Sequence, residues 1–460
     1  MRCPLVIGCL LLAGCASRAE HAIALYETGD YAGAARSADA ELTAHPGDEA
    51  LWRMRIRAAL ALGDAPGVAK AYAAYRDRLD GDDDRPLLRD LAIATLGQAL
   101  ASPSVALKIA AIQAVEAAEL EPLADPVAQR MRDDDDRVVA AAAAAVLHGA
   151  PDAAQAIGDM LHSEDAEARR IAVDGIGRKV GKVAATVLET AAGDSDPRVR
   201  RAAVRWLGQL KDADAAPILA QRLRDPDEAV RAAAASALAH LGAPNPGALD
   251  LGELARIALS DHALAVRLGG VELAAAAHDR TALTSLADDP DAIVAAEAAI
   301  AGGDGAAAAR AIERAAAAAL WSTRAGAANL AVRALGKTAA VAIAHKLATD
   351  ADLGVQLAAA RVLSHAGEQA TAAAIFASAL ATDHRIDAAI DLAMLDDQRG
   401  IAALDDAVRD LAHGPANRAA AATAHRTAHR ITPGLVAALA DDSGAVRVEA
   451  AAALALMTRP

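Results

Sequence analysis

The sequence predicts an all-α fold, a right-handed solenoid in which helix pairs stack along one axis. Two observations predict it. First, Arg169, Arg200 and Arg231 follow one another at intervals of 31 residues, which indicates a repeat array. Second, each copy contains apolar residues at helical spacing, so one face of its helix is apolar. A single helix cannot bury such a face, and each copy therefore has to pack on the next.

The clearest copy spans residues 194–210 and starts with an acidic turn that contains Pro197. After this turn, one face of the predicted helix is apolar and includes Val199 and Leu207, while arginines occupy the other positions. A second short apolar helix precedes each acidic turn. The repeated unit is therefore a helix, an acidic turn and a helix.

An aspartate stands three residues before the apolar start of each predicted helix. An Asp side chain accepts hydrogen bonds from the free amides of a first helical turn, and its charge suits the positive end of the helix dipole. These residues are therefore predicted to cap helices: Asp135, Asp165, Asp196, Asp227, Asp291 and Asp352.

The pairing resembles HEAT repeats, specifically the short kind found in phycobilisome lyases, with an Asp-x-x-Val-Arg start and a later Leu-Gly. The residues that match are Asp196, Val199, Arg200, Ala203, Leu207 and Gly208. The resemblance extends over residues 103–242, 352–367 and 446–454, and is degenerate over 243–336. It implies about eleven helix pairs from Pro86 onward, with the second helices forming the concave wall.

Composition limits the class of ligand. The 460 residues are 54% hydrophobic but only 2% aromatic, and the net charge is −15. We therefore expect a large core of Ala, Leu and Val, and no nucleic-acid ligand, because phosphate binding needs clustered Lys and Arg and no basic stripe is evident. No cofactor and no metal site are expected either.

The first residues resemble a bacterial lipoprotein signal peptide. A short apolar run ends in Leu12, Ala13, Gly14 and Cys15, and it is too short to span a membrane. The resemblance implies cleavage after residue 14, lipidation of Cys15 and sorting to the outer membrane. An ordinary secretory signal or a chance apolar start is the alternative. With Cys3 and Cys9 removed, the mature chain would contain no cysteine pair for a disulfide.

Residues 15–80 contain a different repeat. Gly29 and Gly63 lie 34 residues apart, each followed by Asp, and Trp52 occupies a large-aromatic position. The pattern resembles a pair of tetratricopeptide repeats, with Arg55 and Ile56 departing from it. Such a pair either binds peptide or caps the longer array, and we favour a cap, because terminal repeats must cover an exposed apolar face.

An acidic run at residues 80–84, closed by Pro86, predicts a surface linker over 81–86 between these repeats and a HEAT-like solenoid over 87–460. Neither this run nor residues 133–136 has the ligand spacing of a calcium loop, so both are expected to be solvated. His425 and His429 are interpreted as a surface pair. Gly175, Gly177 and Gly181 are interpreted as glycines that end a repeat helix and not as a dinucleotide loop, because no strand precedes them.

These observations predict a protein-interaction scaffold without enzymatic activity, anchored by lipid and facing the periplasm. The candidate partner contacts are Arg201, Arg205 and Trp321, the last because it lies in the degenerate stretch that also contains Pro244 and Pro246. Arg231 is a further possible contact. Pairing with acids of neighbouring turns is favoured for Arg200 and Arg231.

Two alternatives remain. The resemblance to bilin lyases leaves an enzyme possible, since a fold does not fix a function, although few aromatic residues are available to line a tetrapyrrole pocket. The other alternative is a passive spacer in the cell envelope.

Overall fold

The computed structural model describes residues 18–242 and 249–460, and every regular element in these two ranges is a helix. This confirms the predicted all-α fold. The signal peptide, Cys15, Pro244 and Pro246 lie outside the described residues. The chain divides into two compact units: unit 1 comprises Met1–Thr95, Asp405–Arg426 and Ile431–Pro460, and unit 2 comprises Leu96–Leu404 and Thr427–Arg430.

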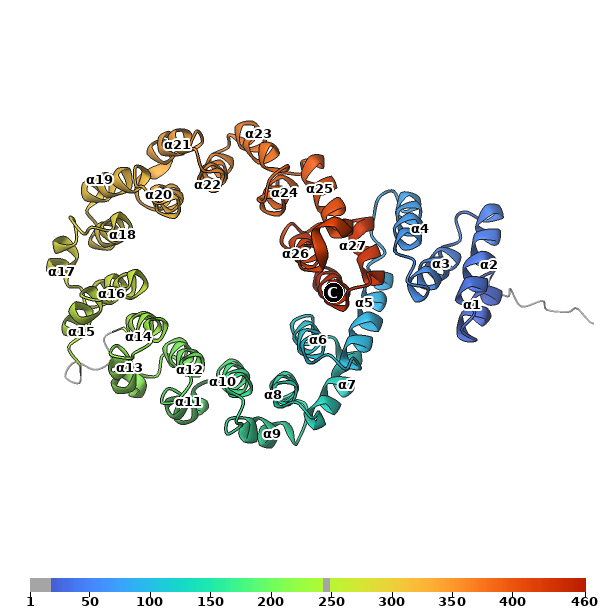
Figure 1. Ribbon diagram of the computed structural model, residues 1–460, viewed down its shortest axis with the longest axis horizontal. Coiled ribbons are helices and arrows are strands. Elements are labelled where there is room, and N and C mark those ends of the chain that lie inside the picture. Colours follow the sequence, from blue (N-terminus) through green and yellow to red (C-terminus); the bar gives the residue numbers. More distant parts are fainter. Residues whose placement is uncertain (1–17, 243–248) are drawn as a thin grey trace, which may run out of the picture. The chain divides into compact units, whose positions relative to one another are not determined.

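Unit 2 is a stack of helix pairs in two layers (Figure 1). As predicted, the second helices form the inner layer: α6 (Val105–Ala117), α8 (Asp136–Ala145), α10 (Ala166–Val180), α12 (Pro197–Leu210), α14 (Glu228–Leu241), α16 (Leu264–Ala276), α18 (Ala292–Gly302), α20 (Trp321–Ala334), α22 (Leu353–His365) and α24 (Arg385–Met394).

The first helices of the pairs form the outer layer: α7 (Ala124–Gln129), α9 (Ala153–Met160), α11 (Ala185–Ala191), α13 (Ala216–Arg222), α15 (Leu251–Leu259), α17 (Arg280–Ser285), α19 (Gly305–Ala316), α21 (Gly336–Leu347) and α23 (Gln369–Ala379). Short 3-10 turns join them to the inner layer in places: η1 (Glu121–Leu123), η2 (Arg130–Arg132), η3 (Gly181–Ala184) and η4 (Ala213–Ala215).

Unit 1 contains helices from both ends of the chain: α1 (Glu20–Glu27), α2 (Tyr31–Ala44), α3 (Glu49–Ala61), α4 (Ala65–Arg78), η5 (Leu411–His413), α26 (Gly414–Thr427), α27 (Pro433–Ala437), η6 (Ala438–Ala440) and α28 (Gly444–Met457). The unit boundaries fall within α5 (Arg85–Leu100) and α25 (Gln398–Arg409). Helix α4 packs on α27, and Arg85 Nη2 donates to the carbonyl oxygen of Met457 at 2.8 Å. The N-terminal helices therefore cover part of the last helix pair.

The helix pairs continue through the stretch where the sequence motif degenerates. Along the described residues, α5 to α28 form twelve successive pairs, against the roughly eleven expected. Aspartates still cap helices in the degenerate stretch, as Asp250 does for α15 and Asp304 does for α19. The motif changes there, but the two-layer arrangement does not.

The six aspartates predicted to start helices are all N-caps, each accepting a backbone N–H in the first turn. Asp196, for example, accepts from the amide of Arg198 at 2.8 Å. The side chain of Arg198 also donates to this carboxylate, and these hydrogen bonds lower the pKa of Asp196 to about 2. The Asp196 cap is therefore ionised at neutral pH.

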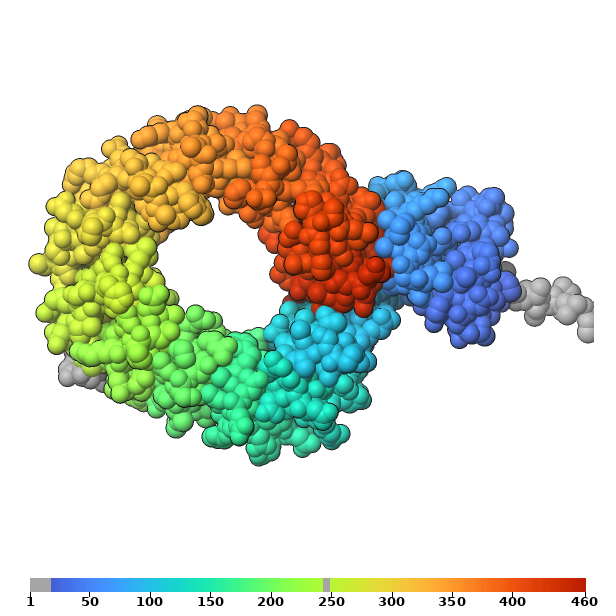
Figure 2. All heavy atoms as spheres, in the orientation of Figure 1, coloured from blue at the N-terminus to red at the C-terminus, as the bar shows by residue number. Residues whose placement is uncertain are grey.

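The core of unit 2 consists mainly of small aliphatic side chains. Leu207 is fully buried, as predicted, and a run of five alanines in α8, from Ala140 to Ala144, is buried as well. Small residues let helices approach closely: a Cβ on Gly208 would lie 2.5 Å from the Cβ of Ala237 on the next inner helix. From the side shown in Figure 2, side chains fill the spaces between neighbouring helices of unit 2.

The predicted acidic surface linker is wrong for its last aspartate. Asp84 is buried, and its carboxylate accepts from Arg53 Nε at 2.6 Å, from the Tyr75 hydroxyl at 2.8 Å and from the Leu87 amide at 3.1 Å. Burial acts to raise the pKa of Asp84, but these hydrogen bonds outweigh burial and lower it. Tyr72 similarly donates to Asp83 at 2.6 Å. Asp83 and Asp84 therefore accept hydrogen bonds from side chains of helices α3 and α4 in unit 1.

Candidate functional site

One row of arginines joins consecutive turns of unit 2 and is structural. Arg200 donates through Nε and Nη2 to the carboxylate of Asp225 at 2.8 and 2.7 Å, and through Nη1 to the carbonyls of Asp194 and Ser195. Burial acts to raise the pKa of Asp225, but Arg200, the Asp227 amide and Arg222 together outweigh burial and lower the pKa. We call this row the arginine ladder: Arg169 with Asp194, Arg200 with Asp225, Arg231 with Asp261 and Arg324 with Asp350.

The ladder confirms the predicted pairing of Arg200 and Arg231 with acids of neighbouring turns. Arg231 is buried, and its guanidinium donates to Asp261 and to two backbone carbonyls, so Arg231 is not available as a partner contact. Other contacts at a repeat turn correct the prediction that residues 133–136 are solvated. Asp133 pairs with Lys108 at 2.7 Å, and Asp136 accepts a hydrogen bond from Ser163.

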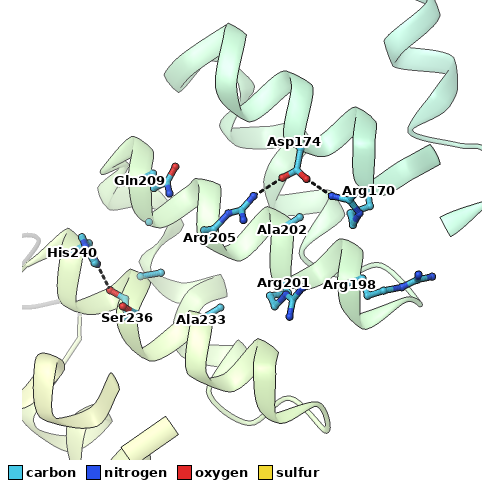
Figure 3. Close-up of a pocket in the computed structure, with 12 residues that line it drawn as sticks. Arg170, Asp174, Arg198, Arg201, Ala202, Arg205, Gln209, Ala233, Ser236 and His240 are labelled. Atoms are coloured by element: carbon cyan, nitrogen blue, oxygen red, sulfur yellow. Dashed lines mark hydrogen bonds and ion pairs between the residues drawn. The ribbon is translucent and has the colours of Figure 1, made fainter. Parts of the chain in front are cut away.

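A second group of arginines faces an open hollow of about 390 Å³ on the inner layer (Figure 3). Helices α10, α12 and α14 line it, and we call it the arginine hollow. The predicted contacts Arg201 and Arg205 both lie there. Its lining residues are Arg170, Asp174, Arg198, Arg201, Ala202, Arg205, Gly208, Gln209, Ala233, Ser236, Ala237 and His240.

Asp174 holds two of these arginines in place. Its carboxylate accepts from Arg170 Nη1 at 2.5 Å, from Arg205 Nη2 at 2.6 Å and from Trp206 Nε1 at 2.9 Å. Figure 3 shows Arg170 and Arg205 reaching Asp174 from opposite sides. The Arg205 guanidinium also lies 5.5 Å from the centre of the Trp206 ring, within the range of a cation–π contact. The side chain of Arg205 is therefore oriented before any ligand binds.

Gly177 leaves the space that Trp206 occupies. A Cβ on Gly177 would lie 2.3 Å from the indole, so any larger residue would displace the ring. Gly175 and Gly177 both lie inside α10, and Gly181, with φ of +69°, ends that helix. The interpretation of these glycines as helix terminators is therefore confirmed for Gly181 and wrong for Gly175 and Gly177, which allow close packing.

The arginines of the hollow differ in how many N–H donors remain free. Among the described residues, none hydrogen-bonds or pairs with the guanidinium of Arg201, which is exposed. Arg205 uses a single hydrogen bond, to Asp174. Arg198 is engaged by Asp196 at 2.9 Å and lies 3.7 Å from Glu167. Arg201 and Arg205 are therefore the two arginines with most donors available to a ligand.

A second hollow of about 520 Å³ adjoins the first and shares Arg170, Asp174 and Arg205 with it. It adds Arg178 and Lys179, both of which pair with Glu116, at 3.4 and 2.9 Å. The linings of the two hollows thus include six cations from two neighbouring helices: Arg170, Arg178 and Lys179 on α10, and Arg198, Arg201 and Arg205 on α12. Five of the six pair with nearby acids, so they do not form a basic stripe free of local neutralisation.

Trp321, the third predicted contact, is separate from the hollow and stands at the start of α20. It is 49% exposed, and its neighbour Leu320 is 60% exposed. One edge of the indole faces Gly354, whose Cβ would lie 3.3 Å from the ring. Trp321 is therefore only partly covered by its own chain.

The predicted surface pair of histidines is wrong for His425. That ring is fully buried, with Nδ1 2.8 Å from the Ala421 carbonyl oxygen and Nε2 2.9 Å from the Thr432 hydroxyl. Helix α26 ends at Thr427, and His429 has a positive φ of 53°, so the two residues are not one turn apart on a helix. No group of three or more potential ligands is placed to hold a metal within residues 18–242 and 249–460. Over the same ranges, no helix has the length and apolar character needed to cross a bilayer.

Comparison with known proteins supports the repeat assignment. The family model described as HEAT repeats matches residues 154–239 and 184–274. These matches include the arginine hollow and continue beyond residue 243, where the motif was expected to degenerate. No curated protein matches the chain.

The chain is also similar to several solved structures at low sequence identity. The complex of CpcE and CpcF of phycocyanin lyase from Nostoc sp. PCC7120 is 22% identical over 51% of this chain and 91% of that chain, with a TM-score of 0.32. An engineered protein is 19% identical over 86% and 96%, with a TM-score of 0.31. Kap95p, solved with RanGDP, is 11% identical over 88% and 65%, with a TM-score of 0.34. The family match identifies HEAT repeats over residues 154–274, and the helix pairs described above form an all-α solenoid.

Proposed function

We propose that this chain is a protein-interaction scaffold without enzymatic activity, and that the inner layer at α10, α12 and α14 binds a segment of a partner protein. The observation that carries this proposal is the arginine hollow. Arg201 has no partner among the described residues, and Arg205 is oriented by Asp174. Exposed, oriented arginines are common energetic centres of protein interfaces.

The chemistry of the hollow suits binding more than catalysis. Its lining offers N–H donors, small apolar residues and one carboxylate, Asp174, which already accepts from three side chains. It also contains His240, whose Nδ1 lies 2.7 Å from the Ser236 carbonyl oxygen, and the Ser236 hydroxyl, which donates to Glu272 at 2.6 Å. A general base needs a free lone pair facing the substrate, and Asp174 is committed to its neighbours. The ladder behind this surface fixes the spacing between helices, so the contact residues are presented on a rigid support.

We place the scaffold in the bacterial cell envelope, held by lipid at Cys15 and facing the periplasm, most simply at the outer membrane. Support comes from the lipoprotein-like residues Leu12 to Cys15. Replacing Cys15 by Ser should abolish incorporation of a labelled fatty acid and release the chain from membranes. Incorporation that persists in the Cys15→Ser variant would overturn the anchor.

Photo-crosslinking in intact cells tests the interaction surface. A crosslinking amino acid at Gln209, which lines the hollow, should capture one defined partner, whereas the same group at Arg280 on outer helix α17 should not. Equal capture from both positions, or none from Gln209, would contradict the proposal. Because Trp321 is half exposed, Trp321→Ala is expected to weaken capture without moving the melting temperature if the surface extends to α20. A large loss of stability with capture retained would instead make Trp321 a core residue.

A further inference from the structure

We propose that the segment held in the arginine hollow is an extended acidic peptide, an inference that rests on the proposed function of this surface. The proposal names the chemistry of the partner: side-chain carboxylates that bind Arg201 and Arg205, and a backbone that lies across α12 and α14.

The first argument is charge. Four arginines line the hollow, but Glu167 and Asp196 pair with Arg170 and Arg198, and Asp174 pairs with Arg170 and Arg205. Arg201 is left without an acidic partner among the described residues, on a chain whose net charge is −15. An uncompensated positive charge at one place on an acidic protein favours a ligand group of opposite sign. Arg201 and Arg205 both lie on α12.

The second argument is the geometry of the donors. A guanidinium binds a carboxylate through two parallel N–H donors, and Arg201 has no competing partner among the described residues. Arg205 is fixed through one nitrogen, Nη2, which leaves its other donors for a ligand. Because Asp174 and Trp206 already restrict Arg205, less side-chain entropy is lost when a carboxylate binds.

The third argument is the floor of the hollow. Small residues also line the hollow, Ala202 on α12 and Ala233 and Ala237 on α14, and the close approach of Gly208 to Ala237 brings these two helices together. A floor of methyl groups lets a peptide backbone approach closely. At the edge, the exposed amide of Gln209 has no partner among the described residues and offers one donor group and one acceptor to that backbone.

The same features disfavour a nucleic acid. Glu167 pairs with Arg170 at 2.6 Å, and Glu116 pairs with Lys179, so acids alternate with the cations along the inner layer. A polyanion needs a continuous basic track and would be repelled at long range by the net negative charge of the chain. A peptide with a few spaced carboxylates does not need a continuous basic track, and its smaller charge reduces the long-range repulsion.

Fluorescence anisotropy with the full-length, detergent-solubilised protein tests the proposal. The probe is a fluorescein-labelled peptide of alternating Glu and Ala, compared at low salt with a peptide in which Gln replaces each Glu. We expect the Glu peptide to bind about tenfold more tightly than the Gln peptide, and this preference to fall as salt is added. Arg201→Gln and Arg205→Gln should each weaken the Glu peptide by about fivefold to tenfold.

Arg280→Gln is the matched control, since it removes an exposed arginine of the outer layer and should leave the affinity unchanged. Circular dichroism melting of each variant verifies that it is folded. Equal binding of the two peptides, or equal losses in Arg201→Gln and Arg280→Gln, would overturn the proposal. So would tighter binding of a labelled oligothymidine that also depends on Arg201, because the hollow would then be a polyanion site.

The crosslinking experiment separates this inference from the proposed function. Capture of a partner from Gln209 without binding of the Glu peptide would leave the scaffold in place and overturn the acidic ligand. The opposite result is Arg201-dependent binding of the Glu peptide without capture of a partner from Gln209 in cells. It would support the acidic ligand and overturn the proposal that this surface binds a partner protein.

Discussion

Unit 2 and unit 1 both bury carboxylates, and unit 1 neutralises them in two different ways. In unit 2 one solution recurs, with an inner-helix arginine reaching the aspartate of the next turn, as Arg200 reaches Asp225 at 2.7 Å. Unit 1 contains one pair of the same kind, between Arg418 and Asp441 at 2.8 Å, but its buried Asp84 accepts from Arg53 and Tyr75 instead. The comparison teaches that a repeat can use one type of ion pair at many interfaces, whereas the N-terminal helices depend on individual contacts.

The largest effect is expected from breaking the ladder. Arg200→Ala would leave Asp225, whose side chain is fully buried, without its bidentate partner and should lower the free energy of unfolding by about 3 kcal/mol. Arg201→Ala, one residue further along the same helix, removes an exposed and unpaired side chain and should change it by less than about 0.5 kcal/mol. Urea unfolding followed by circular dichroism measures both. Similar losses of unfolding free energy in the two variants would contradict the assignment of a structural role to Arg200 and of a binding role to Arg201.

A smaller effect should follow from overfilling the space beside Trp206. Gly177→Ala places a methyl group on the indole and should cost about 2 kcal/mol, while changing tryptophan fluorescence because the ring loses its hydrogen bond to Asp174. Gly158 in outer helix α9 has open space around its Cβ position, so Gly158→Ala should stabilise the chain by about 0.5–1 kcal/mol. Stabilisation by both substitutions would mean that Trp206 is free to move.

Unit 1 should respond to the loss of one hydroxyl group. Tyr75→Phe removes one of the donors to buried Asp84 and is expected to cost about 1 kcal/mol, since Arg53 and the Leu87 amide still hold the carboxylate. Tyr26→Phe is the control, because the Tyr26 hydroxyl has no hydrogen bond within the described residues. Thermal melting of both variants checks this, and a larger loss in Tyr26→Phe would contradict it.

The smallest effect is expected on the pH dependence of the stability of unit 1. Burial lowers the pKa of His425, and the neutral ring is fully hydrogen-bonded, with Nδ1–H donating to Ala421 and Nε2 accepting from Thr432. Asp405 acts in the opposite direction but does not outweigh burial. As pH falls below about 6.5, the unfolded chain binds a proton that folded His425 does not, so acidification favours unfolding. Above that pH the contribution of His425 is constant.

Trp52 lies in unit 1 and is one of three tryptophans, so Trp206→Phe and Trp321→Phe together leave it as a reporter of that unit. The urea midpoint of its fluorescence should fall between pH 7.5 and pH 5.5. The further change His425→Gln keeps a donor and an acceptor without titrating and should flatten this dependence. A fall of equal size in the His425→Gln chain would assign the effect to other groups.

Features set by neighbouring residues could be predicted from the sequence. An Asp before a helix satisfies amides within its own turn, so the caps at Asp196 and Asp227 follow from local chemistry. The fixed period of 31 residues also allowed the ladder at Arg200 and Arg231 to be anticipated.

Features that join distant residues could not be predicted in the same way. The cluster of Asp174, Arg205 and Trp206 depends on side-chain directions across two repeats, although Asp174 and Arg205 do stand one 31-residue period apart. The burial of His425 depends on Thr432, which lies beyond the end of α26 and outside its helical pattern. Helical spacing predicts which residues share a face, but not what covers that face.

The sharing of unit 1 between the two chain ends has a consequence for synthesis. Helix α4 is complete once residue 78 has been made, yet α27, which packs on it, begins at Pro433, and the carbonyl that Arg85 binds belongs to Met457. An emerging chain must therefore keep the α4 surface uncovered through most of translation. Unit 2, whose contacts join neighbouring repeats, can assemble in order as it emerges. A chain that stops before α27 would retain its repeats but leave α4 uncovered, and this exposed surface distinguishes an unfinished molecule from a finished one.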